Sequence, residues 1–187
     1  MLFRSLNKAD KVLIGGGMAN TFFAAQGYEM ADSLVQEEAI DTAKEILAAG
    51  SEKLVLPVDM VIADAFDNDA AKQSVDTGNV PAGWRVLDIG PKTVELYSKL
   101  VSDAATVVWN GPMGVFEMPE FAKGTYAVAQ AVADSDAISI IGGGDSVAAI
   151  QQSGLAPKVT HISTGGGASL EMLEGLVLPG VAALQDK

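Results

Sequence analysis

Apolar residues in this chain gather in runs that have the length of strands. Most of the runs are continuous rather than alternating with polar residues, which is typical of strands covered on both faces, as in a parallel sheet. Pro57 interrupts one run and predicts two short strands there, because proline cannot donate a ladder hydrogen bond. The runs are KVLIGG (11–16), KLVLPVDMVIA (53–63), WRVLDIG (84–90), TVVWNG (106–111), AISIIGGG (137–144) and VTHISTGGG (159–167).

Stretches with a helical spacing of apolar residues lie between these runs. Residues 34–48, 91–103 and 119–133 each place apolar side chains on one face, and short helices are expected after Gly144 and Gly167. The alternation of strand and helix predicts an α/β fold. We expect a three-layer, Rossmann-like open sheet, mostly parallel, with helices on both faces.

The longest break in this alternation is the polar segment 64–84, which contains turn signals at Gly78-Asn79 and Pro81-Ala82-Gly83. It is either a surface loop or a small β excursion. The chain shows no linker and no low-complexity tract, so we expect a single domain over residues 1–187.

Composition narrows the classes of function. The 187 residues are 49% hydrophobic, which is enough for one well-buried domain. The absence of cysteine excludes disulfides, thiol catalysis and cysteine-ligated metal sites. A formal net charge of −12, with Lys and Arg scattered singly, argues against a nucleic-acid partner. No apolar stretch approaches the ~20 residues of a membrane span, so we expect no membrane partner and a cytoplasmic location.

Glycine follows five of the expected strands, in LIGGGMAN, LDIGPK, VWNGPMG, IIGGGDS and ISTGGGAS. In open α/β sheets, ligands bind beyond the carboxyl ends of the strands, and glycine lets the backbone approach a ligand closely. A helix that starts there offers free N–H groups to a phosphate. The loops at Gly142–Ser146 and Gly165–Ser169 are therefore candidate anion sites, although each is equally compatible with an ordinary tight turn.

Several well-known nucleotide and hydrolase motifs are missing. The chain has no G-x-x-x-x-G-K-[ST] loop and no GxSxG elbow. The dinucleotide fingerprint fails at its third position, which is Asn20 in one candidate and Val147 in the other. A single histidine excludes metal sites built on a histidine pair.

Two carboxylates lie beside the glycine-rich loops. Asp145 follows three glycines at an expected helix start, where it suits either Mg²⁺ on a nucleotide phosphate or an N-cap. Glu117 lies just beyond the strand that ends at Asn110. It suits hydrogen bonds from ribose hydroxyls, or it is a solvated loop acid.

The chain resembles phosphoglycerate kinase in five longer segments, which occur in the order that the family has them. They are LIGGGMANTF, LDIGPKT, VVWNGPMGVFE, IIGGGDSVAAI and HISTGGGASLEMLEGLVLPGVAAL. The resemblance runs from about Leu6 to Leu184. It implies that residues 1–187 are a C-terminal nucleotide-binding domain. The N-terminal substrate domain and the first strand–helix unit, which carries a lysine in the family, have no counterpart here.

The resemblance also implies roles for individual residues. It identifies Glu117 as the ribose-binding glutamate and Asp145 as the residue that orients Mg²⁺. By this resemblance Gly144 lies in the phosphate and magnesium loop, and Gly167 lies in the last loop, whose helix start faces the transferred phosphoryl group. Both are the expected catalytic positions. The expected nucleotide-binding residues are Gly15, Gly16, Gly17, Leu87, Asn110, Gly111, Pro112, Val115, Glu117, Gly143, Gly144, Asp145 and Ser146.

The implied reaction is phosphoryl transfer between 1,3-bisphosphoglycerate and ADP, which gives ATP and 3-phosphoglycerate in glycolysis. The implied cofactor is Mg²⁺ with ATP or ADP. The phosphoglycerates would bind through the absent domain, and the full-length enzyme would be a monomer. We expect this chain to be inactive alone, so a non-catalytic nucleotide-binding module is the alternative. A dehydrogenase-type domain is disfavoured by the failed dinucleotide fingerprint.

Overall fold

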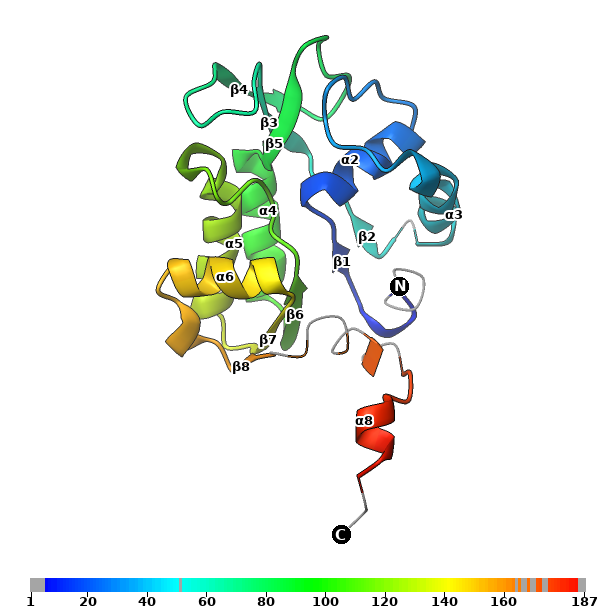
Figure 1. Ribbon diagram of the computed structural model, residues 1–187, viewed down its shortest axis with the longest axis vertical. Helices are drawn as coiled ribbons and strands as arrows, with labels where there is room; N and C mark the ends of the chain where they lie inside the picture. The colour runs from blue at the N-terminus through cyan, green and yellow to red at the C-terminus, as the bar shows by residue number, and fades with distance from the viewer. Residues whose placement is uncertain are drawn as a thin grey trace.

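The computed structural model describes residues 6–50, 52–163, 165, 168, 171–172 and 175–184 (Figure 1). Strands and helices alternate through most of the chain. In order they are β1 (Val12–Leu13), α2 (Gly16–Ala25), the 3₁₀ helix η1 (Glu37–Ala39), α3 (Ile40–Gly50), β2 (Leu54–Val55), β3 (Asp59–Ala63), β4 (Lys72–Asp76), β5 (Arg85–Ile89), α4 (Pro91–Ser102), β6 (Thr106–Asn110), η2 (Pro119–Phe121), α5 (Lys123–Asp134), β7 (Ile138–Gly142), α6 (Gly144–Gln152), η3 (Ala156–Lys158), β8 (His161–Ile162) and α8 (Pro179–Ala182).

The strands of the described residues form three small sheets. β1 and β2 pair in parallel, and β6, β7 and β8 form a parallel sheet in that order. β3 lies between β4 and β5 in an antiparallel sheet. In the parallel sheet Asn110 lies opposite Gly142, so the carboxyl ends of β6 and β7 lie side by side.

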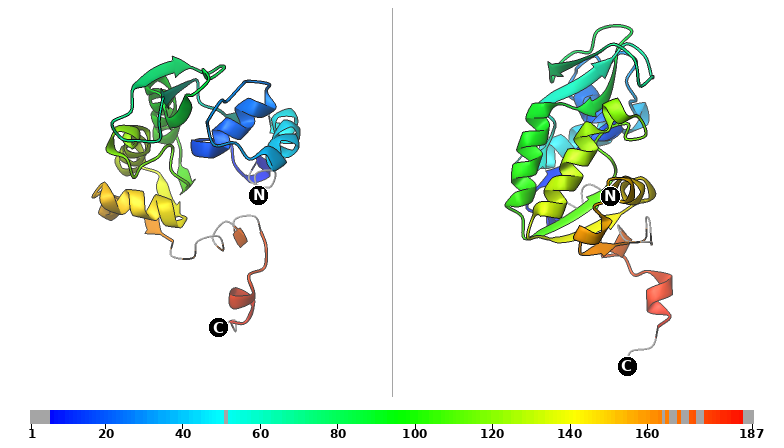
Figure 2. Two further views of the ribbon diagram at one scale, coloured as in Figure 1. Left: turned by 45° about the horizontal axis from the view of Figure 1, so that its top comes forward. Right: turned by 90° about the vertical axis from the view of Figure 1, so that its left-hand side faces the viewer.

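Two hydrophobic clusters join the helices to these sheets. In the first, Phe22 and Phe23 of α2 pack with Ile46 of α3 and with residues of β3. In the second, α4 and α5 lie side by side (Figure 2) and pack Tyr97 and Val128 with strand residues of the parallel sheet. Burial of each large apolar side chain stabilises the fold by roughly 1.5–3 kcal/mol.

The α/β prediction is confirmed, with helices around a parallel sheet. The division of the second apolar run at Pro57 is also confirmed, because β2 ends before it and β3 begins after it. Segment 64–84 is the small β excursion rather than only a loop, since β4 lies within it. β5, the apolar run after this segment, pairs with β3 in the antiparallel sheet.

Two helix boundaries differ from the prediction. The helix expected over 34–48 begins later, at Glu37, because residues 34–36 are held on α2 by side-chain hydrogen bonds. Asn20 Nδ2 donates to the carbonyl oxygen of Leu34, and the amide of Gln36 donates to Thr21 Oγ1. The helix expected over 119–133 is the short η2 followed by α5.

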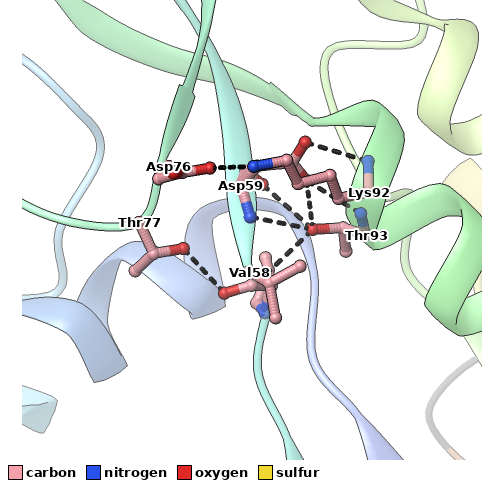
Figure 3. A network of polar contacts seen from close by, with 7 residues as sticks. Val58, Asp59, Asp76, Thr77, Lys92 and Thr93 are labelled. Atoms are coloured by element: carbon pink, nitrogen blue, oxygen red, sulfur yellow. Dashed lines mark hydrogen bonds and ion pairs between the residues drawn. The ribbon is translucent and has the colours of Figure 1, made fainter.

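A buried carboxylate fixes the start of α4 (Figure 3). Asp59 Oδ1 and Oδ2 accept hydrogen bonds from the backbone amides of Thr93 at 2.8 Å and Lys92 at 2.9 Å. Thr93 Oγ1 donates to Asp59 Oδ1 at 2.6 Å and accepts from the amides of Val58 and Asp59. Lys92 Nζ pairs with Asp76 Oδ1 of β4 at 2.6 Å. Asp59 therefore caps α4 from a strand 33 residues earlier in the chain.

One face of the parallel sheet carries exposed apolar side chains. Val108 of β6 and Ile138 of β7 are 42% and 57% exposed, whereas Trp109 and Ile141 on the opposite face are buried. Among the described residues, no helix is both long enough and apolar enough to cross a bilayer.

Candidate functional site

The loop after β6, residues 110–117, contacts the glycine loop after β1. The amide of Gly16 donates to the carbonyl oxygen of Met113 at 3.0 Å. Gly16 has a φ of +58°, and a Cβ on it would lie 2.9 Å from the carbonyl oxygen of Pro112. Glycine is therefore required here both for the backbone conformation and for the close approach of the two loops.

The loop after β7 contacts the start of the same segment, at Asn110 and Gly111. Ser146 Oγ accepts a hydrogen bond from the amide of Gly111 at 2.5 Å. Gly143 has a φ of +83° and is the N-cap position of α6, and a Cβ on it would lie 2.5 Å from Asn110 Oδ1. The ends of β6 and β7 are thus joined by the Ser146 hydroxyl and by close packing of Gly143 against the Asn110 side chain.

Leu87 of β5 is the fourth segment at this position. Its carbonyl oxygen accepts from the amide of Val115 at 2.8 Å, and its side chain is buried. The structure therefore brings together the predicted site segments, which come from four distant parts of the chain. They are Gly15–Gly17, Leu87, Asn110–Glu117 and Gly143–Ser146.

The predicted polar groups at this position are open to solvent. Glu117, Asn110, Gly144 and Asp145 are exposed, whereas the Ser146 side chain is buried against Gly111. Asp145 lies in the first turn of α6, and Gly143 rather than Asp145 is the N-cap position. The N-cap alternative for Asp145 is therefore wrong, and its carboxylate is available to a ligand.

Two predicted glycine positions are not placed at this site. Gly90 follows β5, but a Cβ on it would overlap the Asp59 carboxylate, so this glycine serves the packing of α4 on β3. Gly167 lies outside the described residues. Gly165, two residues earlier, is exposed.

The sequence did not reveal the residues of α5 and β5 that pack beneath the 110–117 loop and fix its backbone by hydrogen bonds and close contacts. Thr125 of α5 is fully buried, and its Oγ1 accepts from the amides of Met113 at 3.0 Å and Gly114 at 3.3 Å. A threonine within the apolar face of a helix was the available signal, because a buried hydroxyl needs a hydrogen-bond partner.

A buried aspartate lies next to this support. Asp88 is 3% exposed, and its Oδ2 accepts from the amide of Gly124 at 2.7 Å while Oδ1 accepts from Ile89. A Cβ on Gly114 or on Gly124 would overlap the Asp88 carboxyl group. Burial raises the pKa of Asp88 to about 7, against smaller opposing effects of the Gly124 and Ile89 amides and of the Lys123 ammonium.

Leu34 is a further side chain that the sequence did not single out. It is 72% exposed, yet a Cβ on Gly17 would lie 2.9 Å from its Cδ2. An apolar side chain is thus held beside the glycine loop and open to solvent, which suits contact with the face of an aromatic ring.

The described residues contain no group of three or more acidic or histidine side chains that would hold a metal by itself. Asp145 is a single exposed carboxylate at the start of α6. This fits Mg²⁺, which typically binds through one or two carboxylates together with phosphate oxygens of its substrate.

Comparison of the sequence with models of protein families identifies the family of this chain. The model described as phosphoglycerate kinase matches residues 1–176. The chain belongs to the phosphoglycerate kinase family. It is 60% identical to phosphoglycerate kinase of Roseiflexus sp. (strain RS-1) over 184 residues and 61% identical to that of Chloroflexus aurantiacus (strain ATCC 29366 / DSM 635 / J-10-fl) over 187 residues. Each match covers 97% of this chain and 47% of the relative.

Solved structures agree with this family assignment. The structure of phosphoglycerate kinase from Coxiella burnetii superposes with a TM-score of 0.93 at 44% identity and covers 97% of this chain. That of phosphoglycerate kinase from Pyrococcus horikoshii OT3 gives a TM-score of 0.84 at 36% identity and covers 98%. Both alignments include 47% of the solved chain, so this chain spans about half the length of the phosphoglycerate kinases that it matches.

Proposed function

We propose that this chain is the nucleotide-binding half of a phosphoglycerate kinase and that it binds MgADP or MgATP where the three loops and Leu87 of β5 meet. The observation that carries the proposal is that Gly15–Gly17, Leu87 and Gly143–Ser146 each contact residues 110–117. Glycine-rich backbone, the exposed carboxylates of Glu117 and Asp145 and the N-terminus of α6 belong to these segments, which supports the proposal.

Each segment has a distinct part in this proposal. Leu87, Val115 and the exposed Leu34 would contact the adenine ring beside the glycine loop. Glu117 would accept hydrogen bonds from the ribose hydroxyls. The backbone amides at the start of α6 would hold phosphate oxygens, and Asp145 would hold the Mg²⁺ that neutralises them.

The full reaction that we propose for the family protein is transfer of a phosphoryl group between 1,3-bisphosphoglycerate and ADP. Such a transfer depends on positioning and on positive groups that stabilise the charge of the moving phosphoryl group. The predicted site segments, GGG (15–17), NGPMGVFE (110–117) and GGDS (143–146), contain no lysine and no arginine. This supports the second candidate for the chain alone, a nucleotide-binding module without catalysis.

Calorimetric titration with MgADP, MgATP and NAD tests the binding site. We expect both adenine nucleotides to bind and NAD to bind more weakly. Nucleotide-dependent amide shifts should cluster at 15–17, 110–117 and 143–146. Shifts confined to residues 64–83 would place the ligand elsewhere and refute the site.

A coupled kinase assay separates the two candidates. We expect negligible turnover from the chain alone. Turnover within the range of about 1–100 s⁻¹ that is usual for kinases would show that the catalytic groups are present in this chain.

A further inference from the structure

Tyr97 of α4 lies outside the loops of the proposed site but is connected to one of them. Its side chain is fully buried. Its hydroxyl lies 2.6 Å from the carbonyl oxygen of Ile14 and 3.0 Å from that of Val55. The single hydroxyl proton is donated to Ile14, the nearer acceptor, because Val55 already accepts from the amide of Ile14 at 3.0 Å.

Ile14 directly precedes the glycine loop. After Ile14 the backbone passes through an extended Gly15 and then turns at Gly16, which has a φ of +58°. Glycine restricts the backbone least of all residues, so the path of this loop depends on the hydrogen bonds at its two ends. At one end the Tyr97 hydroxyl donates to the carbonyl oxygen of Ile14, and at the other the amide of Gly16 donates to the carbonyl oxygen of Met113.

We propose that Tyr97 is a positioning residue for the adenine-binding end of the site and acts through Ile14 on the Gly15–Gly17 loop. The proposal rests on the proposed function, because it assigns that loop to the nucleotide. Tyr97 does not contact the ligand. Its hydroxyl sets the angle at which the chain leaves β1 and thereby the fit of the loop against residues 112–113.

Two properties suit the Tyr97 hydroxyl to this role. Ile14 is buried, so its carbonyl oxygen has to be satisfied from within the protein, and loss of the donor leaves a buried acceptor unpaired. Burial also raises the pKa of Tyr97 far above neutrality, so the phenol remains a proton donor at every pH at which the protein is studied.

The first test is amide hydrogen exchange of the ligand-free chain with Tyr97→Phe. We expect the Gly16 amide to exchange about tenfold faster, while amides within β6 and β7 keep their rates. Tyr126→Phe is the matched control, because its hydroxyl makes only a long 3.4 Å contact to Gln152 on the surface. An unchanged Gly16 rate, or equal acceleration of all amides, would overturn the proposal in favour of a purely structural tyrosine.

The second test measures ligand selectivity. With MgCl2 present, Tyr97→Phe should raise the Kd for ADP about tenfold and leave the Kd for inorganic pyrophosphate unchanged, because the proposed function assigns the phosphates to the start of α6 and the adenine to the Gly15–Gly17 loop. Equal weakening of both ligands, or no change in either, would refute the positioning role. Failure of the unmutated chain to bind ADP would instead refute the proposed function, so the two failures are distinguishable.

Discussion

Replacement of Asp88 by asparagine should make the stability of this protein less dependent on pH. Asp88 is 3% exposed, and burial raises its pKa from 3.8 to about 7. In the unfolded chain the carboxyl group loses its proton near pH 4, whereas in the folded protein it keeps the proton to about pH 7. The stabilisation from the neutral acid is therefore complete below pH 3.8 and is lost as the pH rises through 7.

The magnitude follows from the size of this pKa shift. A difference of about 3 units corresponds to roughly 4 kcal/mol at about 1.4 kcal/mol per unit. Most of this stabilisation, about 3 kcal/mol, is lost between pH 5 and pH 8. Asparagine imitates the protonated acid in shape and stays neutral, so the D88N variant lacks this loss. As the pH rises from 5 to 8, the free energy of unfolding of D88N should therefore increase by about 3 kcal/mol relative to that of the unmutated protein.

Urea unfolding at pH 5, 6, 7 and 8, followed by the fluorescence of the buried Trp109, measures the difference. Asp134→Asn is the control, because Gln130 and Lys158 lower the pKa of the exposed Asp134. Its carboxyl group therefore titrates below this pH range, and the difference between D134N and the unmutated protein should stay constant from pH 5 to 8. A constant difference between D88N and the unmutated protein would refute the reasoning. Direct NMR titration of the Asp88 carboxyl carbon in the unmutated protein gives a second test, and a midpoint near pH 4 would refute the buried environment.

Three further substitutions test the site and its support. Thr125→Val should lower the free energy of unfolding by about 2–4 kcal/mol, measured by urea titration, because two backbone amides of the 110–117 loop lose their acceptor. A loss below about 0.5 kcal/mol would contradict this prediction. Gly124→Ala should lower the melting temperature far more than Gly180→Ala, since only the former adds a Cβ that overlaps buried atoms, and equal shifts would contradict the packing. Asp145→Asn should weaken the binding of MgADP about tenfold in calorimetry and leave metal-free ADP unaffected, and weakening of both alike would argue against a metal-binding role.

The sequence predicted the fold class and most of the elements because continuous apolar runs and helical spacing are local patterns. The strands around Pro57 and the start of α4 at Pro91 follow directly from the chemistry of proline. The sequence did not predict the pairing partner of β5, because strand pairing is decided by residues distant in the chain. A continuous apolar run is compatible with a buried strand of either direction.

The candidate site shows the same division. The glycine-rich strand ends identified the loops, and the structure brings the loops after β1, β6 and β7 together. The sequence did not reveal that Thr125 and Asp88 support them, because both contacts connect segments from separate elements. Gly90 looked like the other strand-end glycines, but its neighbour in space is Asp59 rather than a loop of the site.

The capping of α4 by Asp59 has a consequence for how the protein folds. The first turn of an isolated helix is its least stable part, since four amides there have no acceptor within the helix. In this chain Pro91 has no amide proton, and the three other amides, of Gly90, Lys92 and Thr93, find their acceptor on Asp59 of β3. The Thr93 hydroxyl in turn accepts from the amides of Val58 and Asp59 that lead into β3. Neither element is complete without the other. The start of α4 and the strand β3 should therefore open and close as one cooperative unit, with the same protection against hydrogen exchange.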